Sequence, residues 1–250
     1  VKEFNIIAQD LTNYGKDLYG EVKIAELVNR IAKIDGVKWI RLHYAYPTDF
    51  PYDLLDAIAN NSNVCKYLDI ALQHANDDVL KNMQRHITRE QTEKLLATIR
   101  EKVPGIHIRT TLMVGFPGEG EKEFAELVDF VQAQKFERMG AFAYCEEEDT
   151  YAAKHLDDSI PDDIKQQRLD RIMELQQEIA LVHNKSKIGQ VLTAIIDREE
   201  PDYYVGRTEF DSPEVDPELF IEKTRQLNTG EFYRVEITDA LPYELFGKVV

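Results

Sequence analysis

Apolar β-type runs alternate with helical patterns along most of the chain, and this alternation constrains the fold more than any other feature. Between the runs, apolar residues recur at helical spacing, as at Ile24, Leu27, Val28 and Ile31. Strands that alternate with helices form a parallel sheet of right-handed βαβ units, whose chemistry lies at the carboxyl ends of the strands. We therefore expect an α/β fold with strands at residues 1–7, 38–47, 64–72, 106–116 and 138–145.

The pattern changes near residue 187. Short strands separated by turn residues follow at 190–197, 203–210, 219–223, 231–238 and 245–250. Tyr233, Val235 and Ile237 alternate with polar residues, which is typical of a half-buried strand. The sequence therefore predicts two domains, an α/β domain over residues 1–186 and a small all-β antiparallel barrel over 187–250. We expect most of the barrel's aromatic residues to fill its core rather than stack on bases: Tyr203, Tyr204, Phe210, Phe220 and Phe232.

The net charge of the chain is −16. From residue 187 onward, seven basic residues stand against fourteen acidic ones, and residues 211–218 form an acidic loop without a basic residue. The negative electrostatic field of these charges repels phosphate backbones and attracts basic partners. We therefore expect the barrel to bind a basic protein and not a nucleic acid. Ordinary surface solvation is the alternative explanation of the charge.

Two cysteines and the absence of a long apolar run limit the cellular setting. Cys65 and Cys145 suit a reducing cytosol better than a disulfide framework. No stretch reaches the length of about 18 apolar residues that a membrane span requires. We therefore expect a cytoplasmic protein without a membrane partner.

In residues 111–124, "TLMVGFPGEGEKEF", a predicted strand ends at Gly115-Phe116-Pro117-Gly118, and an acidic helical pattern follows. Pro117 and Gly118 fit the central positions of a type II turn, and Gly115 removes a side chain so that a flat ligand can approach the backbone. The following glutamates and the lack of a Gly-Lys-Ser/Thr motif disfavour a phosphate, since Glu119, Glu121 and Glu123 would repel it. A neutral flat ligand such as adenine fits better, and a plain tight turn is the alternative.

Polar residues also follow the other predicted strands, where a core would not favour them. Together they predict a pocket at one edge of the sheet, although each alone is compatible with ordinary loop polarity. The strand ends in question carry Gln9 and Asp10, Tyr46, Gln73 and His74, and Tyr144, Glu146, Glu147 and Glu148.

These motifs resemble a known family. "VGFPGE" at 114–119 resembles the adenine-side motif of the radical S-adenosylmethionine methylthiotransferases. "YLDIALQHAND" and "VLKNMQR" resemble the RimO type, which modifies an aspartate of ribosomal protein S-twelve, and so do "KEFNIIAQDLTNYGKDLYG" and "IRLHYAYP". The resemblance implies a partial (β/α) TIM-like radical-SAM barrel holding strands two to six, followed by a TRAM barrel.

The resemblance also implies that S-adenosylmethionine is the cofactor and suggests which residues hold it. The backbone of Val114, Gly115 and Phe116 would bind its adenine. Gln73 and His74 would face the ribose or the substrate.

Other roles follow from the same comparison of motifs. Gln9 and Asp10 would approach the methionine ammonium, and Arg85 is the candidate partner of its carboxylate, since a guanidinium binds a carboxylate bidentately. Tyr144 joins the cofactor residues. The residues expected at the substrate are Tyr46, Glu147 and Glu148.

Cysteines are where the chain departs from this family. The family binds a 4Fe-4S cluster through Cys-x3-Cys-x2-Cys after its first strand, whereas Cys65 and Cys145 are eighty residues apart. Neither can hold a cubane alone, because such clusters need several thiolates. We expect that two 4Fe-4S clusters belong to the full-length enzyme with ligands outside this chain, which by itself contains no catalytic or metal-binding residue and is inactive.

Three alternatives stay open. A tRNA adenosine methylthiotransferase is disfavoured by "LQHA" and by the acidic barrel. A non-catalytic protein-binding module would only present the acidic barrel to a basic partner. An α/β-barrel hydrolase is weakened by the lack of a Gly-x-Ser-x-Gly elbow and of a histidine-rich metal constellation.

Overall fold

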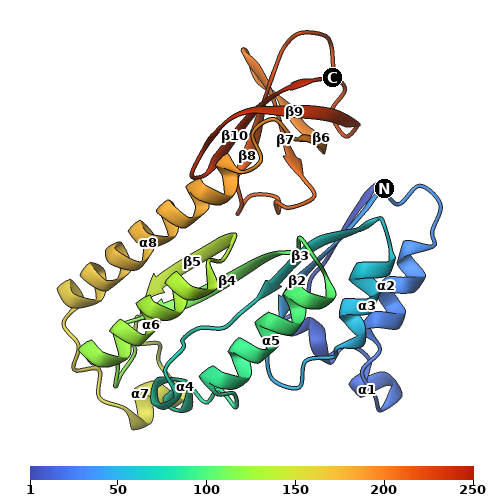
Figure 1. Cartoon of the computed structure of the whole chain (residues 1–250). Helices are drawn as coiled ribbons and strands as arrows, with labels where there is room; N and C mark the ends of the chain where they lie inside the picture. Colours follow the sequence, from blue (N-terminus) through green and yellow to red (C-terminus); the bar gives the residue numbers. More distant parts are fainter.

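Five parallel strands form one open sheet in chain order, as the computed structural model of residues 1–250 shows (Figure 1). They are β1 (Glu3–Ile6), β2 (Trp39–Ala45), β3 (Val64–Ile70), β4 (His107–Val114) and β5 (Arg138–Ala143). Every predicted strand of this series is present, and helical connections join the neighbours, as a parallel sheet requires. The predicted α/β class is therefore confirmed.

Helices cover one face of this sheet and bury the large apolar core. They are α2 (Ile24–Ala32), α3 (Asp53–Asn60), α5 (Arg89–Lys102), α6 (Glu121–Gln134) and α8 (Asp162–Lys185). Short helices lie in the loops that follow the strands: η1 (Leu11–Asn13), α1 (Lys16–Tyr19), α4 (Asp77–Asn82) and α7 (Tyr151–His155). None of the helices combines the length and the apolar composition needed to cross a membrane.

The sheet face opposite the helices, here called the inner face, carries polar and charged residues near the amino ends of the strands. Strand β4 shows the division, because Ile108, Leu112 and Val114 belong to the apolar core while His107 and Arg109 alternate with them. Charged side chains on such a face require partners, since burying an isolated charge is costly.

Those partners come from the C-terminal barrel. Its strands are β6 (Val191–Glu199), β7 (Tyr203–Thr208), β8 (Glu218–Glu222), β9 (Phe232–Leu241) and β10 (Glu244–Val249). They close in the order β10-β8-β7-β6-β9, and all neighbouring pairs are antiparallel except β8 with β10. We expected a purely antiparallel barrel, and this detail was wrong. Strand directions cannot alternate around a closed ring with an odd number of strands, so at least one pair must be parallel.

Residues 208–217 of the barrel, here called the plug loop, lie on the inner face of the sheet. Arg41 Nη1 donates to the carbonyl of Glu209 at 2.6 Å. Tyr67 Oη donates to Asp216 at 2.7 Å, and Arg138 binds Asp211 through Nε at 3.0 Å. The plug loop thereby closes the amino end of the inner face.

This arrangement corrects the expectation that the acidic loop over residues 211–218 steers a basic partner to the barrel. Asp211 and the side chain of Asp216 are buried against the sheet. Burial disfavours the charged form of Asp211, but Arg138, Lys187 and the Thr208 hydroxyl together outweigh it and hold the pKa of this carboxyl below its ordinary value. The two acids therefore join the domains and contribute little to a free surface.

The expectation for the barrel aromatics was also wrong in most positions. Tyr204 alone fills the barrel core. Phe210 stacks on His107 at 4.2 Å between ring centroids, and Phe232 meets Trp39 edge-on at 4.8 Å, so both pack between the domains. The two remaining rings contact each other outside the core: Tyr203 and Phe220.

Candidate functional site

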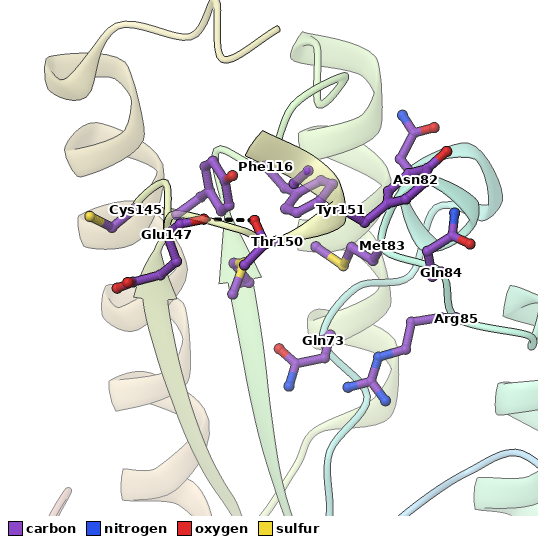
Figure 2. Close-up of a pocket in the computed structure, with 13 residues that line it drawn as sticks. Gln73, Asn82, Met83, Gln84, Arg85, Phe116, Cys145, Glu147, Thr150 and Tyr151 are labelled. Carbon is purple, nitrogen blue, oxygen red and sulfur yellow. Dashed lines mark hydrogen bonds between the residues drawn. The ribbon is translucent and has the colours of Figure 1, made fainter. Parts of the chain in front are cut away.

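A pocket of about 420 Å³ opens at the carboxyl ends of the strands, between the α4 region and α7 (Figure 2). Its apolar wall combines thioethers and rings, with Met83 and Met113 beside Phe116 and Tyr144. Phe116 and Tyr144 pack edge-to-face at 4.9 Å between ring centroids. Such a wall suits a flat, uncharged ring system.

The β4–α6 turn shapes one side of this pocket. Gly118 has φ 93°, and Glu119 N donates to Phe116 O at 2.9 Å, as the predicted turn requires. At Gly115, φ is 72°, and an added Cβ would lie 2.4 Å from Cγ of Lys165. The side chain of Lys165 on α8 therefore occupies the space that we expected a ligand to use, and this expectation is corrected.

Glu119 also differs from its expected role as a repulsive charge at a helix start. The side chain is fully buried and accepts hydrogen bonds from Gly115 N at 2.9 Å and from Arg168 Nη1 at 3.0 Å. His74 Nε2 lies 3.0 Å from Glu119 Oε2. One carboxylate thus joins the β3 end, the β4 turn and α8.

His74 consequently does not line the pocket. Its Nδ1 accepts from Asn76 N at 2.9 Å, so the ring proton resides on Nε2 and is donated to Glu119. The neighbouring Gln73 does line the pocket, with a φ of 70° and backbone bonds to Thr111 O and Met113 N on β4. These adjacent residues therefore differ in role: His74 stabilises the fold through Glu119, and Gln73 faces the cavity.

Arg85 lines the same pocket and forms no ion pair with the chain. Its guanidinium lies over the ring of Tyr46, 4.6 Å from the centroid. The ring of Tyr46 therefore packs against the guanidinium of Arg85 without itself lining the pocket. All guanidinium N–H groups stay available for an anionic ligand group.

Tyr144 lines this pocket, and its hydroxyl is buried without a hydrogen-bond partner in the chain. Burial, together with Glu146 and Asp158, raises the pKa of this phenol. Lys165 Nζ lies 5.3 Å from the ring centroid. A buried hydroxyl without a partner costs free energy, which a ligand acceptor would recover.

The structure brings together only part of the predicted site. Gln73, Arg85, Phe116, Tyr144 and Glu147 line the pocket. Asp10 instead caps η1 by accepting from Thr12 N at 2.9 Å. The remaining predicted residues also lie outside its lining: Gln9, Tyr46, His74, Val114, Gly115 and Glu148.

Sequence reasoning missed Met83 and Met113. Met113 could have been found, because it continues the inner-face phase of β4 that His107 and Arg109 begin. Met83 carries no comparable signal, since it follows the C-terminal end of the short helix α4.

The pocket suits S-adenosylmethionine in its donor set, with an apolar wall for the purine, an unpartnered hydroxyl and an unpaired guanidinium. The residues of this chain do not suit an iron–sulfur cluster. No group of three His, Cys, Asp or Glu side chains is arranged so that it could hold a metal ion. Burial raises the pKa of the Cys65 thiol to about 12, so this sulfur is not available as a thiolate ligand.

A Ser–His–Asp composition occurs on the inner face, where Ser212 Oγ lies 3.2 Å from His43 Nε2. His43 Nδ1 is 3.8 Å from Asp69 Oδ2, too far for the hydrogen bond that a catalytic triad needs. All three residues are buried, with Ser212 in the plug loop and His43 and Asp69 on the sheet beneath it. This cluster therefore holds the domains together and gives no support to a hydrolase.

Two family descriptions match separate parts of the chain. Residues 12–131 match the radical SAM superfamily, and residues 188–250 match the TRAM domain. The ribosomal protein uS12 methylthiotransferase RimO of Parabacteroides distasonis is 56% identical over 250 residues. The protein of the same name from Bacteroides thetaiotaomicron is 57% identical over 251 residues. Each alignment covers 100% of this chain and 58% of the relative.

Among solved structures, the radical SAM enzyme coproporphyrinogen III oxidase (HemN) from Escherichia coli superposes with a TM-score of 0.57. The sequence identity is 15%, and the match covers 84% of this chain and 53% of that chain. This likeness supports the fold alone. The partial radical-SAM barrel and the TRAM barrel expected from the sequence are thus both present.

Proposed function

We propose that this chain, which belongs to the RimO family of radical S-adenosylmethionine methylthiotransferases, is part of an enzyme that modifies ribosomal protein uS12 (S-twelve). The enzyme would methylthiolate the β-carbon of an aspartate in that protein. The observation that carries the proposal is the identity of more than half the residues to the uS12 methylthiotransferases, which extends over both domains. The chain spans 58% of those relatives, so the activity, substrate and partner remain proposals for the whole protein.

The cofactor would occupy the pocket at the carboxyl ends of the strands. When bound, S-adenosylmethionine supplies the methyl group and the chemistry that activates a C–H bond. Phe116 and Met113 would contact its purine, and Tyr144 would donate its free hydroxyl. Arg85, which no carboxylate of the chain neutralises, would hold the methionine carboxylate. Gln73 would reach the ribose, since its side chain lies in the same cavity.

Other expected roles become narrower. His74 would act on the cofactor only through Glu119, because its ring is buried behind the β4 turn. Gln9 and Asp10 stay candidates for the methionine ammonium, although they lie outside the pocket. Glu147 would face the substrate from the pocket, and Glu148 from the same exposed loop.

We propose that uS12, a basic protein, approaches the acidic TRAM barrel, which would be residues 187–250 of a cytoplasmic enzyme. Asp211 and Asp216 no longer support this route, because they are buried. The support comes from acids that are exposed and form no ion pair, namely Asp202, Glu214, Glu222 and Asp239. Unpaired surface charge raises association rates with partners of opposite sign.

The test uses the full-length protein with its clusters reconstituted under anaerobic conditions. It is incubated with uS12 and, separately, with bulk tRNA, and mass spectrometry then searches both for an added methylthio group. A modified aspartate peptide with unmodified tRNA is the expected result. Modified adenosine with an untouched protein would overturn the proposal in favour of a tRNA methylthiotransferase.

A further inference from the structure

Strand β2 contains an extra residue close to its carboxyl end. Leu42 pairs with Leu68 and Ala45 with Ile70, so three steps along β2 correspond to two along β3. Leu42 and Ala45 both belong to the helix-covered core. The bulge between them therefore changes which face the intervening residues occupy.

Tyr44 is the residue that this bulge displaces. Its φ is 59°, in the left-handed region that a bulky side chain rarely adopts. The side chain is 49% exposed, whereas the neighbours His43 and Ala45 are buried. Its ring lies 6.2 Å from that of His43, which binds Ser212 of the plug loop on the inner face. Tyr44 thus belongs to the inner face and not to the core.

Other exposed apolar side chains lie on the same face at the same end of the sheet. Phe142 is 63% exposed and pairs in register with Met113, which lines the cofactor pocket. Ile7, which directly follows the core-facing Ile6, is 61% exposed. The plug loop fills the opposite end. The open end of the inner face is thus apolar and lies next to the pocket.

We propose that Tyr44 is a substrate-contacting residue whose ring packs on the polypeptide segment that carries the target aspartate. The proposal rests on the proposed function. Tyr44 does not line the pocket assigned to the cofactor, so its ring stays free for a second molecule. A strained backbone that exposes an aromatic ring beside a cavity is characteristic of a functional site, because the same position would be more stable with glycine.

The strain gives the proposal a test that separates structure from function. Tyr44→Gly relieves the backbone and removes the ring, so the melting temperature should rise by about 2–4 °C. The kcat/KM for uS12 methylthiolation should fall about tenfold, the loss expected for one aromatic contact. Binding of S-adenosylmethionine, measured by equilibrium dialysis, should stay unchanged, and Tyr44→Phe should keep most of the activity.

Lys135→Gly is the matched control. Lys135 has a φ of 50° at the C-terminal end of α6, away from the pocket, so this variant should gain stability and keep its activity. A Tyr44→Gly enzyme as active on uS12 as the wild type would overturn the inference and leave the proposed function intact. A Tyr44→Gly enzyme with weakened S-adenosylmethionine binding would also overturn it, in favour of a cofactor contact. A wild type that leaves uS12 unmodified would overturn the proposed function and this inference together.

Discussion

His74 Nε2 and Glu119 Oε2 lie 3.0 Å apart, and both side chains are fully buried. The pair connects the end of β3 to the turn after β4, and Arg168 extends it to α8. This connection positions the residues on either side of the pocket, Gln73 and Phe116, although neither member of the pair reaches the cavity. The geometry of the pocket therefore depends on the carboxylate of Glu119, which does not itself line the cavity.

Replacing Glu119 by Ala should lower the free energy of unfolding by about 3–5 kcal/mol, because Arg168 would keep a buried charge without its main partner. Urea denaturation followed by circular dichroism measures this loss. Glu121→Ala is the control, since Glu121 binds the same Arg168 from an exposed position. That variant should cost at most about 1 kcal/mol. Equal losses for the two variants would contradict the assigned role of Glu119.

Arg138→Ala should loosen the attachment of the TRAM barrel to the sheet. Arg138 and Asp211 are both buried, so the lone carboxylate left behind should cost about 3–5 kcal/mol. Limited proteolysis should cut the variant faster in the plug loop than the wild type. Arg198→Ala serves as control, because Arg198 pairs with Glu218 on the exposed barrel surface. If both variants resist the protease equally, the plug loop does not depend on Arg138.

Because of Lys187, the free energy of unfolding should increase as the pH rises from about 8 to 10.5. Burial, and then Arg138, lowers the pKa of this amine from 10.5 to about 8. Between these values the unfolded chain binds the proton that the folded chain has lost, so the free energy of unfolding increases with pH. The increase should be about 3 kcal/mol, obtained as the difference between the wild type and Lys187→Met at each pH. A difference that stays constant from pH 8 to 10.5 would contradict this origin.

Tyr144→Phe should separate ligand binding from folding. The hydroxyl has no partner within the chain, so its removal should leave the stability of the ligand-free protein unchanged or slightly higher. The affinity of the reconstituted full-length enzyme for S-adenosylmethionine should fall about 3–10-fold, as for one lost hydrogen bond. Unchanged affinity would show that the hydroxyl does not contact the cofactor.

The elements that follow from local periodicity were predictable from the sequence. Spacing at Ile24, Leu27, Val28 and Ile31 correctly predicted α2, and apolar runs correctly predicted all five parallel strands. The type II turn at Pro117 and Gly118 was also predictable from the sequence, because its geometry depends on these two residues themselves.

What escaped prediction depends on contacts between distant residues. Asp211 and Asp216 look like surface acids until Arg138 and Tyr67 are known to face them across the domain boundary. Glu119 looks exposed until Arg168 on α8 reaches it. The bulge at Tyr44 leaves no periodic signal, because one extra residue only shifts the phase of a short strand.

The plug loop also sets the order in which this chain can finish folding. Arg41 and its acceptor Glu209 are separated by 168 residues, and Tyr67 and Asp216 by 149. At ribosomal rates, roughly 8–34 s pass between the synthesis of the two members of the first pair. During that interval the arginines of the inner face lack their final partners, and the sheet can pack its helices but cannot complete its other face. The last quarter of the chain must therefore be synthesised before the buried charges of the inner face acquire their partners.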